Sequence, residues 1–201
     1  TVETWIVWNA NGVATTQIFQ LDKSFGADGM VVKNDITKIT DLKGKTVAAS
    51  APGTAPFFTL AWMLKKNGMT TKDVKIVNLE PQAAANAMIA GNAGLDAAMT
   101  YEPYLSAVRA KPEAGKIIAT TLDYPMIMDT FGCVPKFLAD NPKAAKAIAD
   151  SYFEAVEMIS KEPKKSFEIM GADVKQTGEA FEASQKYLRW QDRAANLKFF
   201  S

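Results

Sequence analysis

The middle of the chain alternates between strand-like and helix-like segments, with only short connections between them. Pro56–Asn67 reads as a helix that stops at Gly68, and Pro81–Ala90 as a second helix followed by Gly91. The predicted strands around them are TVAAS (46–50), VKIVNL (74–79), LDAAMT (95–100) and KIIAT (116–120). Because such alternation requires right-handed crossovers, residues 35 to about 124 predict an α/β unit with a largely parallel sheet covered by helices.

The segments on either side of this unit have a different character. A short helix, a strand at 15–21 and a turn at 22–24 precede it, and a long amphipathic helix at 142–160 and two further helices follow it. Two short strands flank the unit, ADGMVV (27–32) and DTFGCVP (129–135). A chain that leaves one lobe, builds a second and returns has this pattern. We therefore expect three parts, which are a partial first lobe with a hinge strand (1–33), an α/β second lobe (34–126), and a return hinge strand with C-terminal helices (127–201).

Composition excludes several classes of function. The 201 residues include 23 Lys and Arg against 22 Asp and Glu, a net charge of +1. That balance lacks the basic excess of a nucleic-acid-binding protein. No apolar run approaches the length of a membrane span. No signal peptide is visible at Thr1, so the chain is mature, trimmed or cytosolic.

The chain contains no histidine and one cysteine, Cys133. Ser-His-Asp and Cys-His catalysis are therefore excluded, as is a zinc site that relies on imidazole. We expect no metal and no cofactor, and we assign no catalytic residue. An enzyme that uses Asp, Glu, Lys or Tyr stays open as an alternative.

One candidate binding loop lies between the strand that ends at Ser50 and the helix that starts near Pro56. The first turn of a helix leaves N–H groups unpaired, and its dipole favours negative charge there. Gly53 lets the backbone approach a ligand, and Thr54 adds a hydroxyl. Alternatively, Thr54 only caps the helix.

A second candidate loop follows the strand LDAAMT, also at a strand's carboxyl end, where open α/β sheets bind ligands. Tyr101 can stack or hydrogen-bond, and Glu102 can accept from N–H donors. Alternatively, Glu102 only complements the dipole of the next helix. Asp22 and Ser24 lie between the first two strands, at the expected junction of the lobes.

Taken together, these segments resemble a known family. The stretches DLKGK, the small-residue loop APGT, AAANAMIAGNAGLDAA and EPYLS occur in the order typical of the nitrate/sulfonate/taurine-type substrate-binding proteins of bacterial ABC transporters, which include thiamine-pyrimidine-precursor-like members. The resemblance covers residues 15 to about 160. Family members are substantially longer than this chain.

The resemblance implies a periplasmic-binding-protein-like bilobal fold (type II), here with the second lobe complete and the first partial. ADGMVV and DTFGCVP would be its two crossing strands, and the ligand would lie in the cleft. Carried over by position, the ligand-binding residues are Asp22, Ser24, Gly53, Thr54, Tyr101 and Glu102. The implied protein is periplasmic or extracytoplasmic and monomeric. It passes a small molecule to a membrane permease, and it associates with the membrane only through that transporter or a lipid anchor.

The charge of the candidate residues bears on the ligand. The helix N-terminus alone favours an anion such as a sulfonate, whereas Asp22 and Glu102 would oppose one. Apart from Lys23, we find no Arg or Lys near these loops, so the sequence favours a neutral or amino-bearing small organic molecule.

Three functional hypotheses remain open. The first is a transport-linked binding protein that works by hinge closure. The second is an enzyme of the same fold that uses Glu102, and the third is a ligand-sensing regulatory module. The fold also resembles an enzyme, the fungal-type thiamine-pyrimidine synthase. That enzyme needs a histidine and a cysteine-rich motif, both of which this sequence lacks.

Overall fold

A computed structural model describes residues 1–201, which form two compact units. Unit 1 comprises residues 1–23 and 128–201, and unit 2 comprises residues 24–127. The first boundary therefore lies between Lys23 and Ser24, ahead of the predicted boundary after Lys33. The difference arises because ADGMVV belongs to the sheet of unit 2.

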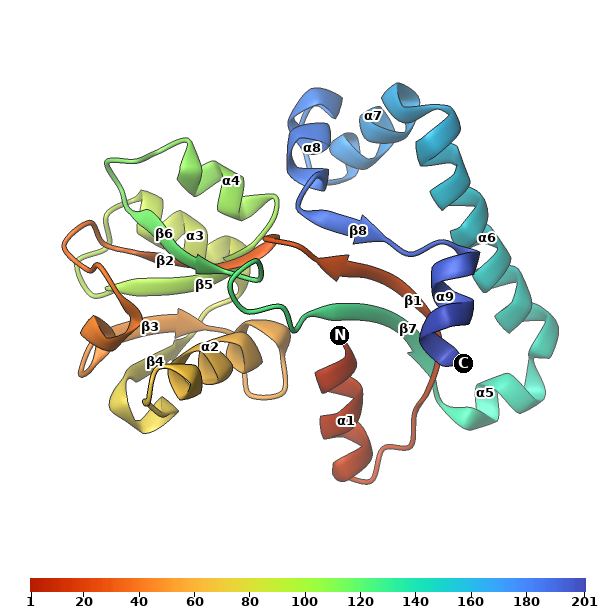
Figure 1. The fold of residues 1–201 in the computed structure, drawn as a ribbon, viewed down its shortest axis with the longest axis horizontal. Coiled ribbons are helices and arrows are strands. Elements are labelled where there is room, and N and C mark those ends of the chain that lie inside the picture. The colour runs from red at the N-terminus through yellow and green to blue at the C-terminus, as the bar shows by residue number, and fades with distance from the viewer. The chain divides into compact units, whose positions relative to one another are not determined.

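Unit 2 is built on a five-stranded sheet of order β4-β3-β5-β2-β6 (Figure 1). Its strands are β2 (Asp28–Val32), β3 (Thr46–Ala49), β4 (Lys75–Asn78), β5 (Ala97–Tyr101) and β6 (Lys116–Thr120). β3 runs parallel to β4 and β5, which confirms the predicted parallel core. β2 pairs antiparallel with both β5 and β6, and all five of its residues are buried. The prediction that ADGMVV is a crossing strand is therefore wrong.

Helices cover both faces of this sheet because alternate strand residues point to opposite sides. Three helices do so, α2 (Ala55–Lys66), α3 (Pro81–Ile89) and α4 (Tyr104–Arg109), and short 3-10 turns lie at Ile39–Leu42 and Thr71–Asp73. Met30 and Val47 belong to the core on the α2 side, whereas Val31 and Ala48 belong to the core beneath α3 and α4. Figure 1 shows α2 on one side of the sheet and the other two helices on the opposite side.

Asp96 connects neighbouring strands at the end of the sheet that lies opposite the candidate loops. Its carboxylate accepts the Thr46 backbone N–H at 2.9 Å and pairs with Lys33 at 3.2 Å. The Thr46 N–H, followed by Lys33, holds the pKa of this carboxyl below its ordinary value. An acid with a lowered folded pKa stabilises the fold above its unfolded pKa, and this contribution is lost as pH falls through the folded pKa.

We therefore expect Asp96→Asn to reduce stability at neutral pH by on the order of 1 kcal/mol. The loss should begin to shrink below about pH 4, where the carboxyl of the unfolded wild-type chain takes up a proton, and it should shrink further as pH falls through the lower folded pKa. Urea unfolding at several pH values measures both quantities. Parallel stability curves for the two proteins would contradict this assignment.

Unit 1 contains a three-stranded sheet of order β7-β1-β8. Its elements are α1 (Val2–Ala10), β1 (Thr16–Ser24), β7 (Met128–Cys133), α5 (Pro135–Asp140), α6 (Pro142–Lys161), α7 (Pro163–Asp173), α8 (Gly178–Gln185), β8 (Leu188–Trp190) and α9 (Arg193–Phe200). The predicted short helix at the start of the chain and the predicted helix at 142–160 are confirmed as α1 and α6. Residues 22–24, predicted as a turn, instead continue β1, and β7 lies within unit 1, so DTFGCVP is not a crossing strand.

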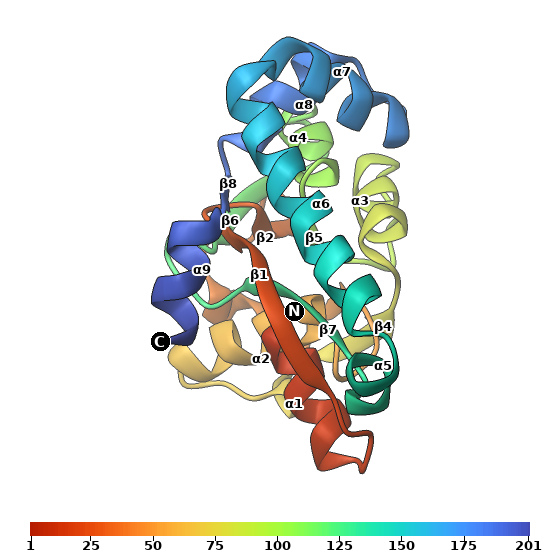
Figure 2. The ribbon, with the colours of Figure 1, turned by 90° about the vertical axis from the view of Figure 1, so that its right-hand side faces the viewer.

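The β1–β7 pair of unit 1 is packed on both faces. On one face, Phe19 stacks on Phe131 and on Tyr152 of α6, with ring centroids 5.2 and 5.0 Å apart. On the other face, Trp5 of α1 donates its indole N–H to Thr130 at 2.8 Å. Figure 2 shows α6, α1 and the two strands from the side.

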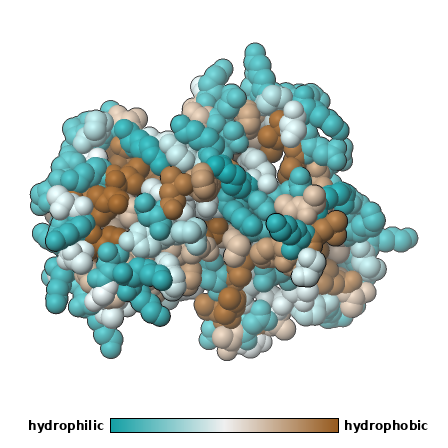
Figure 3. Space-filling view, viewed as in Figure 1, coloured by the Kyte–Doolittle hydropathy of each residue, from teal (hydrophilic) through white to brown (hydrophobic).

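The face drawn in Figure 3 is mainly polar and carries several separate apolar patches. One patch lies over α1, where Ile6 and Trp8 are exposed. None of the helices combines the length and the apolar character needed to cross a bilayer.

Candidate functional site

The sheet of unit 2 brings the candidate loops to one edge. β3 and β5 are neighbouring parallel strands, so the loop after Ser50 and the loop after Tyr101 leave the sheet at the same edge. β2 runs the opposite way, and its first residue, Asp28, pairs with Tyr101. All predicted site residues except Asp22 belong to unit 2. The topology therefore gathers Ser24, Gly53, Thr54, Tyr101 and Glu102 at one end of the sheet.

The first loop presents backbone N–H groups at the start of α2. Gly53 has φ +91°, a left-handed conformation that glycine adopts without strain. Thr54 occupies the N-cap position, but its hydroxyl donates to the Ala51 carbonyl at 2.7 Å and accepts no N–H from the helix. The alternative that the Thr54 side chain caps α2 is therefore wrong.

The amino end of α2 keeps its positive potential. The N–H groups of Gly53, Ala55 and Phe57 make no backbone hydrogen bond in the structure, and Pro56 has none to donate. The first turn carries no acidic side chain that would offset the helix dipole. Such a helix start favours an anionic group.

The second loop offers an aromatic ring. Tyr101 is the last residue of β5 and is 37% exposed. Its ring centroid lies 5.9 Å from that of Tyr104, with the ring planes at 42°. The loop is anchored by the Glu102 N–H, which donates to the Ala27 carbonyl at 2.8 Å. A ring held in this way can stack on or hydrogen-bond to a small molecule.

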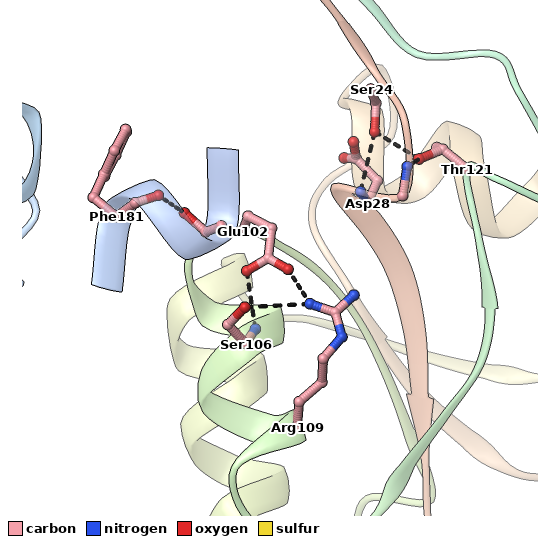
Figure 4. Close-up of polar contacts among 9 residues, drawn as sticks. Ser24, Asp28, Glu102, Ser106, Arg109, Thr121 and Phe181 are labelled. Carbon is pink, nitrogen blue, oxygen red and sulfur yellow. Dashed lines mark hydrogen bonds and ion pairs between the residues drawn. The ribbon is translucent and has the colours of Figure 1, made fainter. Parts of the chain in front are cut away.

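The Glu102 carboxylate is engaged within the chain (Figure 4). Its side chain is 5% exposed, accepts the Ser106 N–H at 3.0 Å and forms an ion pair with Arg109. The Ser106 bond agrees with the alternative that Glu102 complements the start of α4. The prediction that only Lys23 could offset the candidate carboxylates is wrong. No regular helical spacing marks this pair in the sequence, because Glu102 precedes α4, which begins at Tyr104, whereas Arg109 is the last residue of that helix.

Ser24 is buried and ties two chain segments of unit 2 together. Its hydroxyl bonds the Thr121 hydroxyl at 2.6 Å and accepts the Asp28 N–H at 3.1 Å. Thr121 in turn accepts the Gly26 N–H at 2.8 Å. Figure 4 shows this cluster where the chain enters β2 and leaves β6. Sequence reasoning missed Thr121, which no motif marks.

Asp22 lies in unit 1. It is buried on β1, opposite Asp129 of β7, which pairs with the terminal ammonium group at 3.4 Å. The pKa of nearby Tyr152 is raised to about 12, chiefly by burial and also by the negative charges of Asp22 and Asp192. Asp22 as a ligand contact stays a prediction.

The structure contains no group of three or more acidic or cysteine side chains placed to hold a metal ion. Cys133 is a free, half-buried thiol. The site therefore consists of backbone N–H groups, hydroxyls, a tyrosine ring and a paired carboxylate. These groups are suited to holding a small polar molecule.

Sequence comparison relates the chain to periplasmic binding proteins. It is 31% identical over 144 residues to the taurine-binding periplasmic protein of Escherichia coli K12, an alignment that covers 69% of this chain and 43% of that protein. The chain thus spans less than half the length of the curated relatives it matches.

Solved structures share the fold. The alkanesulfonate-binding protein SsuA of Xanthomonas axonopodis pv. citri, solved bound to MOPS, superposes with a TM-score of 0.77 at 17% identity, covering 92% of this chain and 62% of that one. The desulfurization enzyme DSZB superposes with a TM-score of 0.65 at 13% identity, covering 90% and 68%. These likenesses confirm the predicted α/β periplasmic-binding-protein-like fold.

The family assignment rests on a match across most of the chain. The sequence model described as NMT1/THI5 like matches residues 8–166, which include β1, the whole of unit 2 and α6. This range contains every predicted site residue. The chain therefore belongs to the NMT1/THI5-like family.

Proposed function

We propose that the protein carrying this chain is an extracytoplasmic solute-binding protein that delivers a small polar organic molecule to the permease of an ABC transporter. The observation that carries the proposal is the set of N–H groups without a backbone partner at the start of α2. This helix follows β3, and β3 is the neighbour of β5, the strand that ends at Tyr101. The periplasmic binding proteins among its relatives support the location and the partner. Ligand binding would shift the protein from an open to a closed population.

We further propose that the ligand carries an anionic group such as a sulfonate. A neutral or amino-bearing ligand was expected in part because the charge of Glu102 had no evident cationic partner. Because Arg109 pairs with Glu102, the amino end of α2 dominates the charge preference of this edge. The E. coli relative is a taurine-binding protein by name, and taurine carries both a sulfonate and an amine.

The residues divide into two proposed roles. Gly53 and Thr54 would contact the anionic group through their backbone, and the Tyr101 ring would cover the organic part. Ser24 and Glu102 would hold the surrounding segments in place through the bonds described above. Asp22 remains the proposed contact from unit 1.

An enzyme that uses Glu102 receives less support from this site. A general base needs a carboxylate oxygen within reach of substrate, whereas the oxygens of Glu102 contact the Ser106 N–H and Arg109. Turnover of a bound sulfonate that is lost in Glu102→Gln would favour the enzyme over the binding protein.

Substitution of Gly53 tests the proposed site. We expect Gly53→Val to weaken binding of taurine by about tenfold or more, because the side chain strains the φ +91° backbone and covers the N–H groups. Calorimetry on the whole protein, with taurine, methanesulfonate and nitrate as probes, measures the effect.

Gly68→Val is the matched control for this experiment. Gly68 lies just past the other end of α2 with φ +72°, and an added Cβ would meet nothing within 4 Å. It introduces comparable backbone strain away from the proposed site, so it should leave taurine affinity unchanged. Equal losses in the two variants would contradict the site. A wild-type protein that binds no small anionic solute would contradict the function.

A further inference from the structure

We infer that Arg109 is a positioning residue that sets the charge preference of the binding edge by neutralising the buried Glu102 carboxylate. The inference rests on the proposed function, because it concerns how the proposed site accepts an anion. In this role, α4 contributes to ligand specificity through Arg109, its last residue, which no sequence motif marks.

The pair is built into the start of α4. Glu102 immediately follows Tyr101, and its carboxylate is held by the Ser106 N–H and by the Arg109 guanidinium. The same guanidinium donates to the Ser106 hydroxyl at 3.2 Å. Figure 4 shows the three side chains converging on one face of the helix. The negative charge adjoining the tyrosine is therefore compensated locally.

Without this compensation, the edge would carry a buried negative charge. Glu102 follows β5, and β5 is the direct neighbour of β3, whose loop leads to the N–H groups of α2. An isolated carboxylate there would repel the anion that the helix start attracts. Partial burial weakens screening by solvent and salt, so the effect should extend to the neighbouring loop.

This role predicts opposite effects for the two partners. Arg109→Met should weaken taurine binding by about tenfold, because it leaves the carboxylate unpaired. Glu102→Gln should strengthen binding by about twofold to threefold, because it removes the negative charge of the carboxylate while the amide oxygen can still accept the Ser106 N–H. The double variant should return to within about threefold of wild type. A purely structural role would lower affinity in both single variants.

Calorimetry with taurine on the whole protein and its variants tests the inference, with thermal unfolding recorded for each. The matched control is Lys33→Met, which removes the same charge from another ion pair of unit 2, at the opposite edge of the sheet. It should leave taurine affinity unchanged.

Opposite signs for the single variants and recovery in the double variant would support the inference. If the folded Arg109→Met and Glu102→Gln variants both lose taurine affinity, or if Arg109→Met loses none, the inference is overturned. The proposed function still stands in that case, provided that the wild-type protein binds taurine. Absence of anion binding by the wild-type protein would overturn the proposed function and this inference together.

Discussion

Leu60→Ala is expected to lower the free energy of unfolding of unit 2 by about 3–5 kcal/mol. Leu60 lies on α2 and is 0% exposed, packed in the core that α2 forms with the sheet. Truncation removes buried methyl groups and leaves a cavity beneath the helix whose amino end forms the proposed site. The loss arises from the lost transfer free energy together with the cavity term.

Leu122→Ala is the control for this prediction, since the same chemical change is made in the same unit at a side chain that is 52% exposed. Its effect should stay within about 0.5 kcal/mol. Hydrogen exchange measured by mass spectrometry localises the change to unit 2, which matters because two units need not unfold together. Equal losses of protection in the two variants would contradict the assigned core.

Asn196→Ala should destabilise unit 1 by about 2–4 kcal/mol, because it leaves two buried backbone groups without a partner. The Asn196 amide accepts the Gln20 N–H at 2.6 Å and donates to the Gln20 carbonyl at 3.0 Å. At the next residue of β1, the Leu21 carbonyl is instead bonded by the Gln191 N–H at 2.9 Å. A side chain of α9 thus continues the pairing of the strand edge beyond β8.

Asn196→Asp separates the two bonds, because a carboxylate keeps the acceptor and loses the donor. It should be destabilised as well, since the Gln20 carbonyl then faces an oxygen. Asn11 is an exposed residue of unit 1 whose side-chain amide donates one hydrogen bond, to the Val7 carbonyl. Asn11→Ala should therefore change stability by less than about 0.5 kcal/mol. Urea unfolding, followed by hydrogen exchange, measures the stability of unit 1 in the Asn196→Ala, Asn196→Asp and Asn11→Ala variants. An Asn196→Ala protein as stable as Asn11→Ala would refute this role.

The parallel part of unit 2 could be predicted from sequence because local signals agree there. Each of its predicted helices is bounded by glycine, proline or a polar turn, and the buried strands β3 and β5 read as short apolar runs. β2 reads the same way, yet its place between β5 and β6 depends on partners far along the chain. Periodicity identifies a strand without identifying its sheet, which is why ADGMVV was assigned to a crossing.

Other misses have the same origin in tertiary contacts. Residues 22–24 look like a polar turn, but pairing of Asp22 and Lys23 with β7 keeps them extended. The last predicted helix corresponds to α8, which ends at Gln185, and the β8 and α9 elements that follow it were not predicted. At the candidate site, the two loops were located correctly at one sheet edge. The pairing of Glu102 with Arg109 could not be predicted because Glu102 lies before α4, and a separation of seven residues across a helix start matches no regular ion-pair spacing.

In the proposed site, backbone N–H groups at the start of α2 hold an anionic solute. Titration of the isotope-labelled whole protein with taurine, followed by the backbone amide signals of Gly53 and Ala55, tests this contact most directly. We expect these two signals to be among the most strongly shifted and to follow the calorimetric binding curve. Calorimetric binding of taurine with both signals unmoved would contradict it.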